Sequence, residues 1–507
     1  MNRCLITTLA LLAPVVGLAD DEPVGSRKQR RGNIPAEQVE FFEREVRPLL
    51  VKHCFECHSA KSKPLQGGLR LDTREATRRG GESGAAVSEV FPEVASHVDD
   101  LCIVNSMHCT NPRHGGAVLE WHTGTDTGFG RDWDYQVVWN RPRHPDNSGH
   151  YFYDQLIETN GGKAKLTEGY STDNYTNWAV DYIKGENRQA DKPWYLWLCY
   201  GAVHGPFTPA KRHLDIYPGI RVPTPKDIFP PRPGKPDYMQ KIEYWVKDKN
   251  GRPELKGGQF GGQTVEGAKG IHGNTLTDWV RQYHQGVRAL DESVGTLIKT
   301  LKATGQYENT LVVFTSDQGF GWGQHGFCRK IAPYDGTIRS PLIISMPGRI
   351  PQGKVCRHPV AGVDLVPTFF RFADMPLPWD MHGHDLSPLL RKPGSKWDHP
   401  TLAIYTQRKY GADTNTIPPR SSTLDSGGVP WWVSLAKGRY KYIRTMEANQ
   451  IEELYDLKKD PDELRNLALE ANHNKRLVRF RTATVRELTR TKAGLVTQLP
   501  PVRTIGR

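Results

Sequence analysis

The strongest constraint on the fold is an alternation of short apolar runs with amphipathic helical segments, which starts near residue 131. The runs TLVVFTSDQG (310–319) and SPLIISMPG (340–348) are apolar enough to be strands buried on both faces. Before the first run, apolar residues recur at helical spacing up to Gly305: Val287, Leu290, Val294, Leu297, Ile298 and Leu301. Buried strands separated by amphipathic helices predict an α/β fold with a mostly parallel central sheet flanked by helices.

A second helix is expected over 171–184. Its apolar residues fall on one face, Ser171, Thr172 or Asp173 is expected to cap it, and Gly185 is expected to stop it.

Three other segments complete the pattern. The apolar run WYLWLCYGAVHG (194–205) predicts another buried strand, and the proline-rich stretch 222–236 predicts an irregular surface excursion. The stretch 428–468 predicts two short strands, a turn and a helix, and so a small C-terminal α+β subdomain.

Polar residues with chemical potential follow two of the predicted strands. In open α/β sheets ligands gather beyond the carboxyl ends of the strands, where Asp317, Gln318 and His204 are expected to lie. The carboxylate of Asp317 and the carbonyl of Gln318 are hard oxygen donors that suit calcium or magnesium. Lys330 and His204 offer a cation and a proton donor to a tetrahedral anion and its leaving group. Each residue also has an ordinary interpretation as a turn cap, a core histidine or a solvated lysine.

A family resemblance favours the chemical interpretation. From Gly130 to its end the chain closely resembles the sulfatase family of the alkaline-phosphatase-like superfamily, through KPWYLWLCYGAVHGPF, VVFTSDQGFGWGQHGF, RKIAPYDGTIRSPLIISMPG, HGHDLSPLL and ELYDLKKDPDELRNLA in family order. The resemblance implies that Asp317 and Gln318 are calcium ligands. It also implies that His204 lies near the leaving group and that Lys330 contacts the sulfate.

The same resemblance shows what this chain lacks. Members of the family begin with a strand that ends in Asp-Asp, followed by C-x-P-S-R, whose cysteine becomes the formylglycine nucleophile, and none of these stands here in family form. Residues 88–128 instead resemble part of another secreted family of the superfamily. Cys109, in CTNPRHGG, is a shifted echo of C-x-P-S-R and is the candidate nucleophile; an ordinary or disulfide-bonded cysteine is the alternative.

Other residues of this junction are of the right type to replace the missing groups. Asp99 and Asp100 form an acidic pair, but they precede an apolar run instead of ending one. His108, His114 and His122 are candidates for a metal site, although histidines of a polar loop more often bind none. Residues 101–107, LCIVNSM, are expected to occupy the place of the missing central strand.

The N-terminal part contains a separate motif. Cys54, Cys57 and His58 have the spacing C-x-x-C-H, in which two thiols bond to haem and the histidine is an axial ligand. A disulfide or a zinc pair is the alternative. The segment 40–87 resembles the short cytochrome c-like domain of many secreted bacterial proteins, which implies haem c.

The first residues and the overall charge bear on location and partners. Residues 1–19 read as a secretory signal, because Arg3 precedes an apolar stretch too short to span a bilayer. The chain is therefore expected to be exported to a periplasm or beyond. Eight cysteines less Cys4 of the signal leave seven, which argues against a complete disulfide framework. The formal charge of +12 favours acidic partners, and without a dense basic tract nucleic acid is discounted.

These observations predict five parts: the signal (1–19), a truncated cytochrome c-like segment (40–87), a junction (88–128), a sulfatase-like domain without its front end (129–400) and a C-terminal subdomain (401–507). The predicted function is hydrolysis of sulfate esters, of the arylsulfatase or sulfated-glycan type, impaired by the missing nucleophile and calcium ligands. The predicted partner is a sulfated small molecule or glycan. The alternative is a non-catalytic exported protein that binds haem or sulfated polysaccharide.

Overall fold

The computed structural model describes the sulfatase-like part of the chain in most detail. The described residues are 4–9 and 102–108 as backbone strands, a few positions between 44 and 61, and 133–139, 152–160, 162–205, 207–257, 270–407, 409, 411–419 and 428–503. Cys54, Cys57, His58, Asp99, Asp100, Cys109, His114 and His122 lie outside them.

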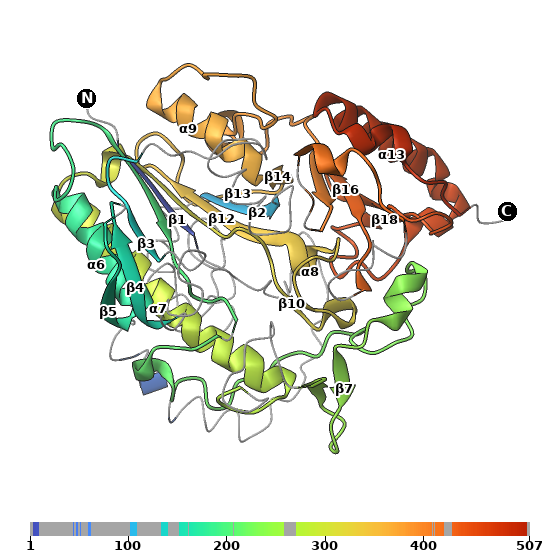
Figure 1. The fold of residues 1–507 in the computed structure, drawn as a ribbon, viewed down its shortest axis with the longest axis horizontal. Helices are drawn as coiled ribbons and strands as arrows, with labels where there is room; N and C mark the ends of the chain where they lie inside the picture. The colour runs from blue at the N-terminus through green and yellow to red at the C-terminus, as the bar shows by residue number, and fades with distance from the viewer. Residues whose placement is uncertain are drawn as a thin grey trace.

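The centre of the fold is a seven-stranded sheet with helices on both faces (Figure 1). Its strand order is β13-β2-β12-β9-β1-β6, and β14 also pairs with β2. The bounds are β1 Cys4–Leu9, β2 Cys102–His108, β6 Trp194–Cys199, β9 Thr310–Thr315, β12 Arg339–Ser345, β13 Lys354–Cys356 and β14 Val360–Ala361. Only the two pairings of β12, with β9 and with β2, are antiparallel. The predicted α/β fold with a mostly parallel sheet is confirmed.

Strand β9 is buried on both faces, as its sequence predicts. Leu311 and Val313 pack in the core beneath α9 (Leu365–Ala373), whereas Phe314 packs in the core that contains α6 (Ser171–Lys184) and α7 (Leu276–Ala303). Successive side chains of a strand point to opposite faces, so one short apolar run serves both cores. These cores fix the position of the strand's carboxyl end.

The long helices form where their periodicity predicts. Helix α7 starts at a capping box in which the Thr275 hydroxyl and the Asp278 carboxylate each bond the other's backbone. Helix α6 ends at Gly185, which adopts a left-handed conformation (φ 113°). The prediction that Ser171, Thr172 or Asp173 caps this helix is wrong, because the helix already begins at Ser171. Tyr170 is the N-cap residue, and its side chain makes no capping bond.

Two segments of the N-terminal part lie in the central sheet in places that the sequence did not predict. Strand β2 forms as expected and lies inside the central sheet, between β12 and β13. The place between β9 and β6 is taken by β1, parallel to both, from the segment interpreted as a secretory signal. A signal removed after residue 19 would take β1 with it, so the two assignments exclude each other in one mature chain. The sequence alone did not give these neighbours, because short apolar strands can pair with many others and tertiary structure sets the partners.

The remaining elements surround this sheet. A three-stranded sheet comprises β3 (Val137–Trp139), β4 (Tyr153–Thr159) and β5 (Lys165–Tyr170), and a hairpin pairs β7 (Trp245–Lys247) with β8 (Pro253–Leu255). Short 3₁₀ turns η4 (Lys211–His213) and η5 (Asp237–Lys241) flank the stretch 222–236, which has no helix or strand, as predicted.

The C-terminal subdomain is a four-stranded antiparallel sheet covered by one helix. The strands are β15 (Thr401–Tyr405), β16 (Trp432–Lys437), β17 (Tyr440–Thr445) and β18 (Glu453–Asp456), and the helix is α13 (Asn474–Arg490). The stretch 428–468 therefore holds three strands where two were expected, and the helix follows it. The short helices α8 (Asp335–Ile338) and α10 (Ser387–Arg391) precede this subdomain in the chain.

Candidate active site at the carboxyl edge of the sheet

The candidate residues lie at one edge of the central sheet. In the register of the parallel strands, Leu9 of β1 faces Cys199 of β6 on one side and Thr315 of β9 on the other. Asp317 follows Thr315 by two residues and His204 follows Cys199 by five. Parallel strands end at the same edge, so the loops that carry Asp317 and His204 both start at this edge of the sheet.

Asp317 and Gln318 are almost wholly buried at this edge, 3% and 1% exposed. The Ser316 hydroxyl donates to the Gln318 backbone carbonyl at 2.9 Å and lies 3.5 Å from Asp317 Oδ1, and the Gln318 amide donates to Oδ2 at 3.4 Å. These two contacts of the Asp317 carboxylate are long and therefore weak. Gly319 is required next, because a Cβ there would lie 2.6 Å from the Arg339 carbonyl oxygen on β12.

Lys330 returns to this edge through a tight hairpin. Strands β10 (Gly321–Trp322) and β11 (Cys328–Arg329) pair antiparallel, and Lys330 follows β11 directly. Burial lowers the pKa of the Lys330 ammonium to about 8, and the negative charge of Asp317 opposes this shift. The structure thus brings Lys330 and Asp317 within electrostatic range, although they are thirteen positions apart in the sequence.

The hairpin is held by a residue that sequence reasoning missed, His325. The backbone N–H of His325 donates to Asp227 Oδ1 at 3.0 Å, and its Nδ1 lies 2.6 Å from Asp227 Oδ2. The imidazole lies against the Tyr334 ring, with centroids 4.0 Å apart. Burial lowers the pKa of His325 to about 4, with Lys235 adding to the effect, so the ring is neutral near pH 7 and Nδ1–H donates to Asp227. No local pattern could reveal this pair, because Asp227 lies 98 residues away in the proline-rich stretch.

His204 is oriented by its own loop. Its Nδ1 lies 2.7 Å from the Gly205 carbonyl oxygen. A carbonyl oxygen only accepts, so Nδ1 carries the hydrogen and Nε2 is the atom that can gain or lose a proton. The ring is partly buried.

The donors for a calcium ion are of the right kind but too few among the described residues. Asp317 and Gln318 contribute one carboxylate and one amide oxygen, and calcium takes six to eight oxygen ligands. Within the described part of the chain, no group of three or more His, Cys, Asp or Glu side chains could hold a metal ion. The described residues therefore make only part of such a site.

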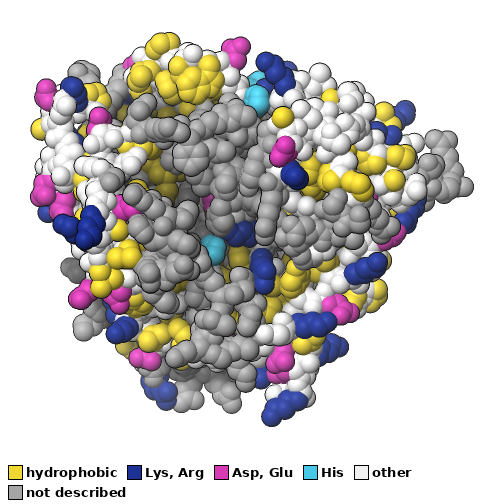
Figure 2. Space-filling view, in the orientation of Figure 1, with side chains coloured by type: hydrophobic (Ala, Val, Ile, Leu, Met, Phe, Trp, Pro, Cys, Tyr) yellow, Lys and Arg dark blue, Asp and Glu magenta, His cyan; other side chains and the backbone are white. Residues whose placement is uncertain are grey.

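The position of β2 bears on the missing half. Its first residue, Cys102, pairs with Ile344, and its last, His108, pairs with Arg339. The chain therefore leaves β2 at the edge where Asp317 lies, because β12 runs antiparallel to both β2 and β9. Figure 2 shows a hollow near the middle of the drawn face, with a histidine and Lys or Arg side chains beside it.

Comparison with known sequences decides the family. The profile of the sulfatase family matches residues 111–375, and that of the C-terminal part of N-sulphoglucosamine sulphohydrolase matches residues 323–490. The chain belongs to the sulfatase family. A planctomycete cytochrome c profile matches residues 54–100, which include the C-x-x-C-H motif.

Two curated relatives are named as sulfatases. The chain is 29% identical over 353 residues to an N-acetylglucosamine-6-O-sulfatase of Bacteroides thetaiotaomicron, covering 62% of this chain and 61% of that protein. It is 26% identical over 322 residues to an arylsulfatase of Clostridium perfringens, covering 62% of this chain and 57% of the relative. The match thus spans about six tenths of these relatives' length.

Solved structures confirm the fold. One, described as a complex with its substrate D-glucosamine-2-N,6-O-disulfate, has a TM-score of 0.64 at 20% identity and covers 79% of this chain and 93% of that chain. A putative sulfatase of Bacteroides fragilis has a TM-score of 0.57 at 17% identity, covering 81% and 92%. Among the described residues of the chain, no helix is long and apolar enough to cross a membrane.

Proposed function

We propose that this chain binds sulfate esters of sugars at the carboxyl edge of its central sheet and hydrolyses them. The observation that carries the proposal is the place of Lys330, which is half-buried after the β10–β11 hairpin and within electrostatic range of Asp317. Burial lowers the pKa of the Lys330 ammonium to about 8, so an anion beside it would stabilise its charged form. A sulfate group is such an anion, and the curated relatives named above are sulfatases.

The residues have complementary roles in this proposal. The Lys330 ammonium holds a sulfate oxygen, and His204 Nε2 gives a proton to the alcohol oxygen as the sulfur–oxygen ester bond breaks. Asp317 and Gln318 would hold a calcium ion together with ligands from outside the described residues, and the ion would draw electrons from the sulfate. Cys109, the residue after β2, is the candidate source of the nucleophile.

The test is sulfate release from a chromogenic aryl sulfate with and without calcium, using purified full-length protein. We expect release that Asp317→Ala reduces by at least about a hundredfold. Asp413→Ala, which removes an exposed carboxylate of the C-terminal subdomain, should leave the rate unchanged. Mass spectrometry of the peptide that contains Cys109 would show whether it has been converted to formylglycine.

A second candidate function is binding of sulfated glycans without turnover. It is favoured by the count of two calcium donors among the described residues. A folded, monodisperse protein that releases no sulfate, but binds a sulfated oligosaccharide less tightly after Lys330→Met, would support it. Absorbance of covalently bound haem in the same preparation would test the C-x-x-C-H segment.

Export stays a prediction. N-terminal sequencing of protein recovered from outside the cytoplasm would test it. A first residue near position 20 would show that the predicted signal has been removed, and β1 with it.

A further inference from the structure

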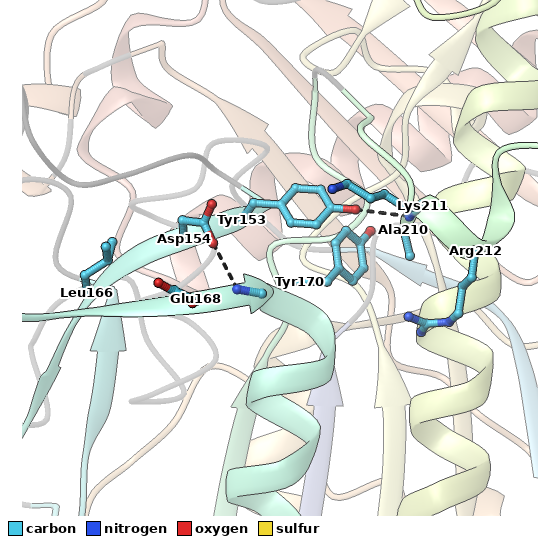
Figure 3. A pocket seen from close by; sticks show the side chains of 9 residues that line it. Tyr153, Asp154, Leu166, Glu168, Tyr170, Ala210, Lys211 and Arg212 are labelled. Carbon is cyan, nitrogen blue, oxygen red and sulfur yellow. Dashed lines mark hydrogen bonds between the residues drawn. The ribbon is translucent and has the colours of Figure 1, made fainter.

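A cavity of about 610 Å³ lies away from the strand-end residues, between the three-stranded sheet and the segment that follows His204. Tyr153 and Asp154 of β4, Leu166 and Glu168 of β5, Tyr170 and Lys211 contribute to its wall (Figure 3). The volume is within the range of small-molecule sites, about 300–1,000 Å³.

The two tyrosines are fixed by the segment on the other side of the cavity. The Tyr170 hydroxyl donates to the Thr208 carbonyl at 3.0 Å, and the Tyr153 hydroxyl donates to the Pro209 carbonyl at 3.3 Å. Tyr153 also accepts a bond from the Lys211 backbone N–H at 3.1 Å. The rings are tilted by 58° with centroids 5.0 Å apart. Their hydroxyls are therefore engaged in positioning the wall, and the rings contribute apolar surface.

The charges at the cavity are unsuited to a polyanion. Arg212 is bound by Asp173 and Glu292, so its charge is neutralised. The exposed carboxylate of Glu168 makes no ion pair with any residue that the structure describes. Asp154 Oδ1 accepts only the Gly169 backbone N–H, at 2.9 Å. Two carboxylates against the one ammonium of Lys211 leave a net negative lining.

We propose that this cavity binds an uncharged, polyhydroxylated sugar unit of the glycan whose sulfated unit lies at the sheet edge. This inference rests on the proposed function, which makes the bound ligand a glycan. Carboxylates accept bonds from sugar hydroxyls, as acidic residues do from ribose, and the half-buried Tyr153 ring offers apolar area to the C–H face of a sugar. Ala210 is six residues from His204, so at most about 22 Å separate them, a span of a few sugar units.

The test is calorimetric binding of an unsulfated trisaccharide of N-acetylglucosamine to the full-length protein. We expect saturable binding that Glu168→Ala weakens about tenfold, because a hydrogen bond to a charged acceptor is lost. Glu186→Ala removes an exposed carboxylate beyond the end of α6 and should leave the affinity unchanged. Leu166→Ala, at a side chain 60% exposed, should weaken binding without a folding defect.

Two results would overturn the proposal: absence of binding to the wild-type protein, or equal affinities of wild type and Glu168→Ala. The trisaccharide sulfated on every unit is the second probe. Stronger binding of this probe after Glu168→Ala would also overturn the proposal, since it would place sulfate in the cavity. Failure of sulfate release with intact binding of the neutral trisaccharide would refute the catalytic proposal alone. The reverse pattern would refute only this inference.

Discussion

The half-buried Lys330 and the fully buried Lys441 have pKa values that are shifted in opposite directions. At Lys330 the charge of Asp317 acts against the effect of burial, and the pKa is lowered to about 8. Lys441 on β17 pairs with Asp335 Oδ1 at 2.7 Å and with Glu463 Oε1 at 2.9 Å, and these carboxylates raise its pKa despite burial.

The difference separates a structural lysine from one suited to bind an anion. The ion pairs of Lys441 join the sheet domain, through Asp335, to the C-terminal subdomain, which contains Lys441 and Glu463. Glu463 also accepts the Asp335 backbone N–H at 2.6 Å. Two opposite charges saturate Lys441. The pKa of Lys330 is lowered instead, so a sulfate beside its ammonium would stabilise the charged form, which is why the proposed function is placed at Lys330.

The largest expected effect is on stability. Lys441→Met should lower the free energy of unfolding by about 3–5 kcal/mol, because two carboxylates would be left buried without their cation. Urea unfolding followed by fluorescence measures it. The comparison variant Lys330→Met should lose much less stability, because it removes a half-buried ammonium whose charged form burial already disfavours. Equal losses in both variants would contradict the distinction between the two lysines.

The next effect concerns the His325–Asp227 pair that holds the hairpin before Lys330. The pKa of His325 falls from its ordinary 6.5 to about 4 in the folded protein, so the unfolded chain binds a proton first as pH falls. Stability should therefore decrease between pH 6.5 and 4 by about 3 kcal/mol from this group.

Unfolding curves at several pH values check this expectation. His325→Asn keeps a residue that tolerates the left-handed backbone (φ 54°) and should flatten the pH dependence. His358→Asn, a histidine in another part of the domain, serves as control. An unchanged slope in His325→Asn would show that another group causes the loss.

The smallest effect is on anion affinity. Below pH 8 Lys330 is charged, so inorganic sulfate should bind with constant affinity there. Above pH 8 its affinity should fall by about tenfold per pH unit as the ammonium loses its proton. Calorimetric titration with sulfate measures the slope, and Lys330→Met should abolish it. A slope that persists in the variant would assign the anion to a different cation.

The strand-end residues could be predicted because each follows a local signal. The apolar run 310–315 ends just before Asp317, and the direction of parallel strands places such ends together, so the sequence alone predicts Asp317, Gln318 and His204 at this edge. The helices α6 and α7 could also be predicted, because 3.6-residue periodicity is a property of the local sequence.

Tertiary structure alone decided which strands pair and which charges meet. The sequence predicted strand β2 but not its pairing with β12, because an apolar run does not by itself specify which strands it pairs with. The contrast between Lys330 and Lys441 was also invisible, because the partners of Lys441 lie 106 residues away at Asp335 and on a different segment at Glu463. The sequence by itself thus determined the fold class and the residues at the strand ends. Long-range packing determined the strand neighbours and the electrostatic state of each lysine, because burial and charge pairing depend on residues distant in the chain.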